Sequence, residues 1–169
     1  RITSITLEEH EGEHDDGFVI NAGLNDAWVT AQAPFQGLFI TVYEELGLVF
    51  VAWFTFDVPS QEGETSPQSV QSALPAVFGA EDQRWVTAVG AYSGSQASLK
   101  LELTTGGLFN AAEPLPTQDT DYGTLDLEFS DCSNGTVTFD VPSMELNGSF
   151  PITRVLEENA ALCQSLAES

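Results

Sequence analysis

The chain has 169 residues, 42% of them apolar. This length is typical of a single domain that buries about two-thirds of its unfolded surface. Its 26 acidic and four basic residues give a formal net charge of −22. That charge argues against nucleic acids and anionic membranes as partners, because both are bound through clusters of Lys and Arg. No apolar run approaches the ~20 residues of a membrane helix, so we expect no membrane insertion.

The first 17 residues form a dense acidic segment without apolar periodicity, which predicts a solvated leader or linker before one β domain at 18–169. The segment contains both histidines, His10 and His14, among six carboxylates. A helical conformation would place these histidines on one face, where they could bind a divalent metal. However, Gly12 lies between them and no HExxH motif is present. We therefore predict no built metal site and no cofactor.

The stretch 46–57 (LGLVFVAWFTFD) dominates the hydrophobic pattern. Its residues are apolar on both faces of an extended chain, so the pattern predicts a central strand that is covered on both sides. A short first strand is expected at 18–20 and another at 28–30. The alternating run at 38–43 is joined to the 46–57 stretch by Glu44-Glu45-Leu46-Gly47, which predicts a hairpin.

A long irregular stretch follows Pro59 and continues to residue 82. Within it, Ser66-Pro67 resembles the start of a helix, with Ser as the cap and Pro at the first helical position. We expect a short helix in 66–74.

Alternating patterns predict four further half-buried strands near 84–91, 99–104, 125–130 and 136–141, and another strand is expected at 150–155. Asn134-Gly135 and Asn147-Gly148 are strong signals for tight turns. The fold class is therefore all-β, an antiparallel meander of about eight strands. A closed barrel of the lipocalin or avidin kind is preferred over a sandwich because closure removes exposed edges. The period changes at 156–167, which predicts a C-terminal helix lying on the sheet.

The chain has two cysteines, Cys132 and Cys163, and neither lies in a CxxC motif or near a His at metal-ligand spacing. An even count without a metal pattern predicts one disulfide and an oxidising location, namely secreted, periplasmic or on the cell surface. Two free buried thiols are the alternative.

Several blocks of the sequence match a known pattern. Gly23 and Trp28 are followed by QGLFI at 36–40, VFVAWFTFD at 49–57 and RWVTAVGAYSG at 84–94. This order resembles the GxW…GQGF…WFTYD…RWxTxxGxYxG pattern of a repeat-like β-rich domain of secreted proteobacterial proteins, with later matching blocks at 105–109, 127–132 and 151–155. The resemblance covers about residues 21–156. The chain departs from the pattern at Phe35, where the family has Gly, and at Val29, where an aromatic residue is common.

The resemblance implies an exported β-rich domain found beside other extracellular modules. It supplies no catalytic residue. The sequence also lacks a GxSxG motif, a His outside the acidic leader and a phosphate-binding glycine loop, so no catalytic residue is assigned.

The remaining candidates for function are aromatic. Aromatic clusters in a β-barrel can stack on sugars or apolar ligands, although they often form only the core. The ligand-binding candidates come from strands expected to be neighbours: Trp28, Tyr43, Trp53, Trp85 and Tyr92, with Arg84 beside them. Arg84 and Arg154 are expected to pair with carboxylates for structural reasons, with anion binding as the alternative.

We therefore expect an exported non-catalytic β module that binds a carbohydrate, an apolar small molecule or a protein surface. One alternative is a glycan-acting hydrolase that uses paired carboxylates, for which Asp57 and Asp131 are the candidates at a barrel mouth. The other alternative is a purely structural spacer.

Overall fold

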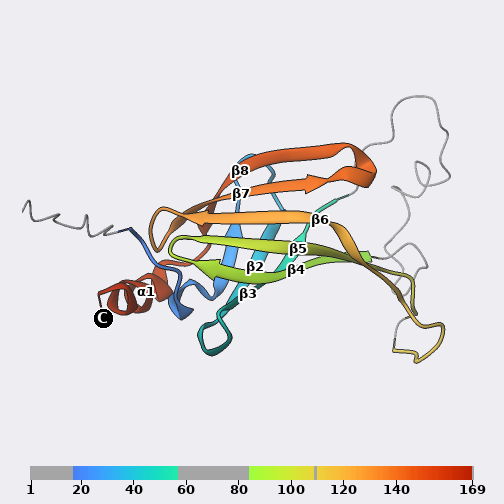
Figure 1. Ribbon diagram of the computed structural model, residues 1–169, viewed down its shortest axis with the longest axis horizontal. Coiled ribbons are helices and arrows are strands. Elements are labelled where there is room, and N and C mark those ends of the chain that lie inside the picture. Colours follow the sequence, from blue (N-terminus) through green and yellow to red (C-terminus); the bar gives the residue numbers. More distant parts are fainter. Residues whose placement is uncertain (1–16, 57–83, 109, 169) are drawn as a thin grey trace, which may run out of the picture.

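The computed structural model describes residues 17–56, 84–108 and 110–168, which form an eight-stranded antiparallel barrel (Figure 1). Each strand pairs with its neighbour in sequence, and the last strand closes the barrel against the first. The strands are β1 (Asp26–Val29), β2 (Gly37–Tyr43), β3 (Leu48–Phe54), β4 (Arg84–Ser93), β5 (Gln96–Thr105), β6 (Thr117–Phe129), β7 (Asn134–Val141) and β8 (Leu146–Arg154). The predicted antiparallel meander and its closure into a barrel are confirmed.

Short helical segments lie outside the strands: η1 (Ala22–Leu24), η2 (Glu44–Leu46), η4 (Pro142–Met144), η5 (Glu157–Asn159) and α1 (Ala160–Ala167). The predicted C-terminal helix is α1, although it begins later than the sequence pattern indicated. The acidic segment at 1–16, with His10 and His14, lies outside the described residues, as does the helix expected in 66–74.

The expected hairpin of β2 and β3 is confirmed, with a register that runs from Gly37 opposite Phe54 to Tyr43 opposite Leu48. The expectation that β3 is covered on both faces is wrong for its outer face. Val49 and Val51 point into the core and are fully buried, whereas Phe54 on the outer face is 55% exposed. A closed barrel encloses only one face of each strand, so the second apolar face of β3 lies on the barrel wall.

The short strand expected at 18–20 is also wrong. These residues run across one end of the barrel outside the sheet, where the Ile20 N–H donates to the carbonyl of Gly94. The Ile20 side chain is buried, so its apolar character reflects core packing and not strand pairing.

One end of the barrel is closed by a packed core. Trp28 and Leu24 are fully buried there, and the Trp28 ring meets Phe129 edge-on at 5.2 Å between centroids. The indole N–H of Trp28 donates to the Leu24 carbonyl, so the one polar atom of this ring is satisfied. Helix α1 lies at the same end (Figure 1).

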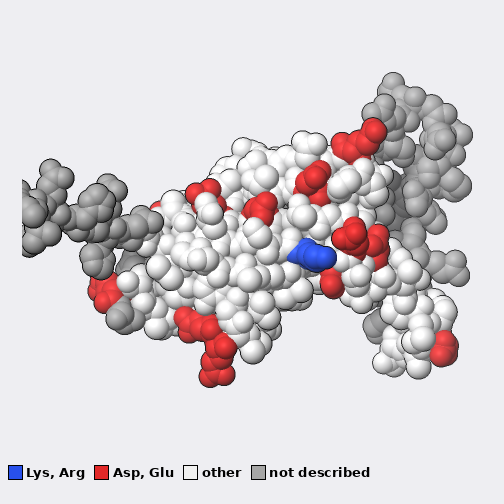
Figure 2. Space-filling model, viewed as in Figure 1, with Lys and Arg blue, Asp and Glu red and all other residues white. Residues whose placement is uncertain are grey.

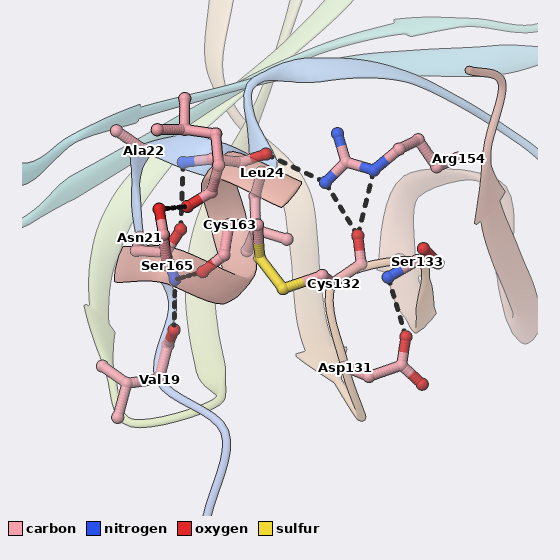
Figure 3. The surroundings of a disulfide bond; sticks show 12 residues. Val19, Asn21, Ala22, Leu24, Asp131, Cys132, Ser133, Arg154, Cys163 and Ser165 are labelled. Carbon is pink, nitrogen blue, oxygen red and sulfur yellow. Dashed lines mark hydrogen bonds between the residues drawn. A yellow bond between two sulfur atoms is a disulfide. The ribbon is translucent and has the colours of Figure 1, made fainter. Parts of the chain in front are cut away.

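The predicted disulfide joins Cys132, in the turn between β6 and β7, to Cys163 of α1 (Figure 3). It holds the helix against the closed end. Gly23 fits against the backbone of Cys163 so closely that a Cβ there would lie 2.3 Å from the Cys163 Cα. Only glycine allows η1 and α1 to approach in this way.

Arg154 connects the same elements from inside the barrel. Its guanidinium, fully buried, donates to Asp26, to the carbonyl of Gly23 and to the carbonyl of Cys132. The guanidinium also lies over the Trp28 ring, 4.9 Å from its centroid. The structural pairing predicted for Arg154 is confirmed.

The connections at 30–36, 106–116 and 142–145 lie at the opposite end of the barrel. No packed core like that around Trp28 and Arg154 fills this end among the described residues. On the outer wall, acidic side chains are spread over the face shown in Figure 2, with little basic surface between them. The outward residues of β6 and β7 include the exposed carboxylates Asp126, Glu128 and Asp140.

Candidate ligand-binding cavity

A cavity of about 600 Å³ occupies the open end of the barrel. Its described lining comes from the ends of β3 to β8, from the 30–36 connection and from η4. The lining residues are Ala33, Phe35, Gln36, Trp53, Phe54, Thr55, Phe56, Trp85, Val86, Leu101, Tyr122, Phe139, Val141, Met144, Leu146 and Phe150. This volume lies within the range of pockets that enclose small organic ligands.

Three aromatic rings form a cluster in the cavity wall. The Trp53 ring lies 5.3 Å from the ring of Phe139 and 6.0 Å from that of Phe150, and the two phenylalanine rings are 6.1 Å apart. All three rings are tilted relative to one another, an arrangement that favours aromatic contact. Each side chain is only half-buried, so the cluster presents apolar surface to the cavity.

Strand alternation places this cluster inside the barrel. Trp53 follows the inward residues Val49 and Val51 on β3, and Phe139 follows Val137 on β7. On β8, Phe150 shares its face with the buried Ile152. Side chains two positions apart point to the same face of a strand, so the closed-end core and the cavity wall are parts of one continuous inner surface.

Exposed aromatic side chains surround the mouth of the cavity. Phe54, Phe56 and Trp85 are between 52% and 70% exposed. Phe35 is 98% exposed and has a φ of 65°. This left-handed conformation strains any residue with a Cβ, and for a bulky side chain it is rare. Glycine adopts such a conformation without strain.

The described lining carries no charged side chain. The side chains in it that can form hydrogen bonds are Gln36, Thr55 and Tyr122, together with the indole N–H groups of Trp53 and Trp85. The Thr55 hydroxyl donates to Oε1 of Gln36, and the Tyr122 hydroxyl donates to the sulfur of Met144. A ligand here would therefore meet aromatic and aliphatic surface with few polar partners.

Two carboxylates were considered for glycan hydrolysis. Asp57 lies outside the described residues, and Asp131 does not line this cavity. Asp131 belongs to the closed end, where its carboxylate accepts from the backbone N–H groups of Ser133 and Asn134. Partial burial raises the pKa of Asp131, but hydrogen bonds from Ser133, Asn134 and Ser130 outweigh this effect and lower the pKa below its ordinary value of 3.8. Such a carboxylate is ionised and structural, whereas a glycosidase acid needs a raised pKa.

The structure separates the six residues predicted to bind a ligand. Trp53 and Trp85 line the same cavity. Trp28 is fully buried in the closed end and does not reach the cavity. Tyr43 and Tyr92 lie at the closed-end termini of β2 and β4, Tyr43 on the outside and Tyr92 packed against the core. Arg84 is the first residue of β4, opposite Thr105, and its side chain is not described.

The candidate set from the sequence omitted Phe139 and Phe150, which complete the aromatic cluster. A signal for them was present, because both occupy inward positions of strands that alternate cleanly. The tryptophans and tyrosines were chosen by residue type. Residue type does not indicate at which end of the barrel a side chain lies.

Across 17–56, 84–108 and 110–168, no group of three or more His, Cys, Asp and Glu side chains is arranged to hold a metal ion. In the same part of the chain, no helix is long and apolar enough to cross a membrane. No protein-family model, curated protein or solved structure matches the chain.

Proposed function

We propose that this protein is an exported, non-catalytic β module that binds a small, uncharged and mainly apolar molecule in the open end of its barrel. The observation that carries the proposal is the cavity of about 600 Å³ with the Trp53, Phe139 and Phe150 cluster in its wall and no charge in its described lining. Barrels of eight strands are wide enough to hold one small ligand.

The lining favours an apolar molecule over a carbohydrate. A sugar brings many hydroxyl groups, and each one that loses water without a new partner costs free energy. The described lining offers few side chains to replace that water. The net charge of −22 disfavours anionic ligands, since the field of the whole protein repels them.

Export is supported by the disulfide between Cys132 and Cys163, because disulfides persist in oxidising compartments. The sequence also resembles a β-rich domain of secreted proteobacterial proteins. We propose this resemblance as a second reason to expect export.

The test is a binding titration with butylbenzene, a neutral probe that is smaller than the cavity. Binding is measured by tryptophan fluorescence and by the change in melting temperature. We expect saturable binding and a raised melting temperature. Trp53→Leu should weaken binding about tenfold, whereas Tyr43→Leu, at the closed end, should leave it unchanged. Absence of any saturable binding to the wild-type protein would refute the proposal.

A second candidate function is protein binding through the outer wall of β1 to β4. The outward residues described there carry no charge, although the chain is strongly acidic. Exposed apolar side chains on this wall are Val29, Phe39, Phe54, Trp85 and Val89. Phe39 and Phe54 contact each other edge-on at 5.5 Å. Exposed apolar side chains that contact each other, as these two do, are typical of interaction sites. Sedimentation at increasing protein concentration tests whether a second copy of this chain is the partner. Phe39→Glu should abolish the association of two copies. A wild-type protein that stays monomeric at all concentrations excludes self-association.

A further inference from the structure

A second chamber of about 290 Å³ lies beside the main cavity. Five residues line both spaces: Ala33, Gln36, Trp53, Phe139 and Phe150. The aromatic cluster therefore stands between two adjoining chambers, the main cavity and this side chamber. The remaining described lining of the side chamber is Thr30, Gln32, Gly37, Leu38, Gly148 and Ser149.

The side chamber exists because β1 is short. It has four residues and pairs with β8 only at Trp28 opposite Arg154 and Val29 opposite Thr153. Strand β8 continues from there toward the open end as far as Leu146, beyond the reach of β1. The wall is thus open at this seam, and the chamber lies between β8 and the 30–38 segment.

Two glycines are among the residues that line the side chamber. On β8, Gly148 occupies an inward position opposite Phe139, and a Cβ there would lie 3.0 Å from the Phe139 ring. On β2, a Cβ at Gly37 would lie 2.5 Å from the carbonyl oxygen of Trp28. A side chain at either position would collide with its neighbour, so glycine allows close approach at both places.

The side chamber also has hydrogen-bonding groups around it. Thr30, Gln32, Gln36 and Ser149 carry hydroxyl or amide groups. The Thr30 side chain is buried, and its oxygen accepts from the Gln32 N–H, so the hydroxyl proton is still available as a donor. The N–H of Val155 points toward β1, because it donates to the Ala27 carbonyl. Backbone N–H groups point to alternate sides along a strand, so the N–H of Ser149, six residues earlier, points to the same side, toward the seam.

We propose that the side chamber binds an uncharged acceptor group, such as a carbonyl or an ether, on a ligand whose apolar body fills the main cavity. This inference rests on the proposed function. It narrows the ligand class to neutral molecules that join an apolar body to one hydrogen-bond acceptor group. The hydroxyl of Thr30 donates to the acceptor, while the Trp53, Phe139 and Phe150 rings contact the chain that links the two parts.

The experiment compares two probes of nearly equal shape, butylbenzene and 4-phenylbutan-2-one, which differ in one carbonyl. The carbonyl makes the ketone more soluble in water, so without a partner the ketone should bind about tenfold more weakly than the hydrocarbon. We expect the ketone to bind the wild-type protein at least as tightly as butylbenzene.

Thr30→Val removes the hydroxyl at nearly constant shape and should weaken ketone binding about fivefold, leaving butylbenzene unaffected. Thr30→Ser should restore ketone binding, which separates the hydroxyl from the packing of its methyl group. Tyr122→Phe is the matched control, because that hydroxyl lines only the main cavity, and it should leave the ratio of the two affinities unchanged.

The two proposals fail in different ways. If neither probe binds, the proposed function is wrong and this inference falls with it. If butylbenzene binds but the ketone is about tenfold weaker, or if Thr30→Val changes neither affinity, the main cavity binds ligand and the assignment of the side chamber is overturned.

Discussion

Asp26 and Arg154, from the first and last strands, form an ion pair of 2.7 Å in the interior of the closed end. The pair lies beside the short ladder of β1 and β8, at the seam where the barrel closes. Arg154 also donates to the carbonyls of Gly23 and Cys132. One guanidinium thus satisfies acceptors from two segments, residues 23–26 and Cys132, that are far apart in the sequence.

We therefore expect Arg154→Met to destabilise the fold by about 3 kcal/mol. Methionine keeps much of the packing against Trp28. It removes the ion-pair partner of Asp26 and the donor to two carbonyls, and breaking a buried pair at one side costs about this much. Urea unfolding followed by tryptophan fluorescence measures the change. Lys100→Met, at an exposed position of β5, is the control and should shift stability by less than about 0.5 kcal/mol. Equal effects of the two substitutions would contradict the role given to Arg154.

The disulfide should stabilise the fold without shaping the cavity. It links residues 31 positions apart, and a loop of this length contributes about 3–4 kcal/mol in the chain-entropy model. We expect the double substitution Cys132→Ser and Cys163→Ser to lower the free energy of unfolding by that amount. Butylbenzene affinity measured below the unfolding transition should stay within about twofold of wild type, because the disulfide lies at the end of the barrel opposite the cavity. A tenfold loss of affinity in the folded variant would show that the two ends are coupled.

Phe35→Gly should raise the stability of the fold. The left-handed backbone at Phe35, with φ at 65°, costs a residue with a Cβ about 1–2 kcal/mol, and glycine avoids that cost although it gains entropy in the unfolded chain. The expected net gain is about 0.5 kcal/mol in urea unfolding. Phe35→Leu keeps the Cβ and serves as the control, with no gain. Stabilisation by leucine equal to that by glycine would exclude backbone strain as the reason.

The contribution of Asp131 to stability should depend on pH. Its pKa in the folded protein is below the ordinary value of 3.8, so folding favours the ionised form. The resulting stability is fully present above the unfolded pKa and is lost as the pH falls through the folded pKa. We expect Asp131→Asn to be less stable than wild type at pH 7 and this difference to shrink as the pH falls below 3.8. Comparing the two proteins at each pH cancels the effect of the other carboxylates; a difference that is constant with pH would contradict the prediction.

Much of the fold was predictable because barrel strands alternate along their length. The inward set of β7, which includes Val137 and Val141, is visible in the sequence as a period of two, and so is that of β5. The disulfide followed from two cysteines without a metal pattern. The 18–20 segment was misassigned because a short apolar run looks the same in a strand and in a segment that packs across the end of a barrel.

The candidate site was less predictable. Alternation tells which side chains share a face but not how far along the barrel they lie. Tyr43 and Trp53 belong to one hairpin, yet Tyr43 is at the closed rim and Trp53 at the open rim. Pairing register and strand length set these positions, and both depend on the neighbouring strands.

The sequence by itself determined the class of fold, the inner and outer faces of most strands and the covalent link at the closed end, because local periodicity and residue type encode these properties. Only the tertiary structure decided that Arg154 and Trp28 fill one end and that Trp53, Phe139 and Phe150 meet at the other. It also decided that a short β1 leaves a side chamber at the seam. These features arise from closure, which brings the first and last strands together and has no local signature in the chain.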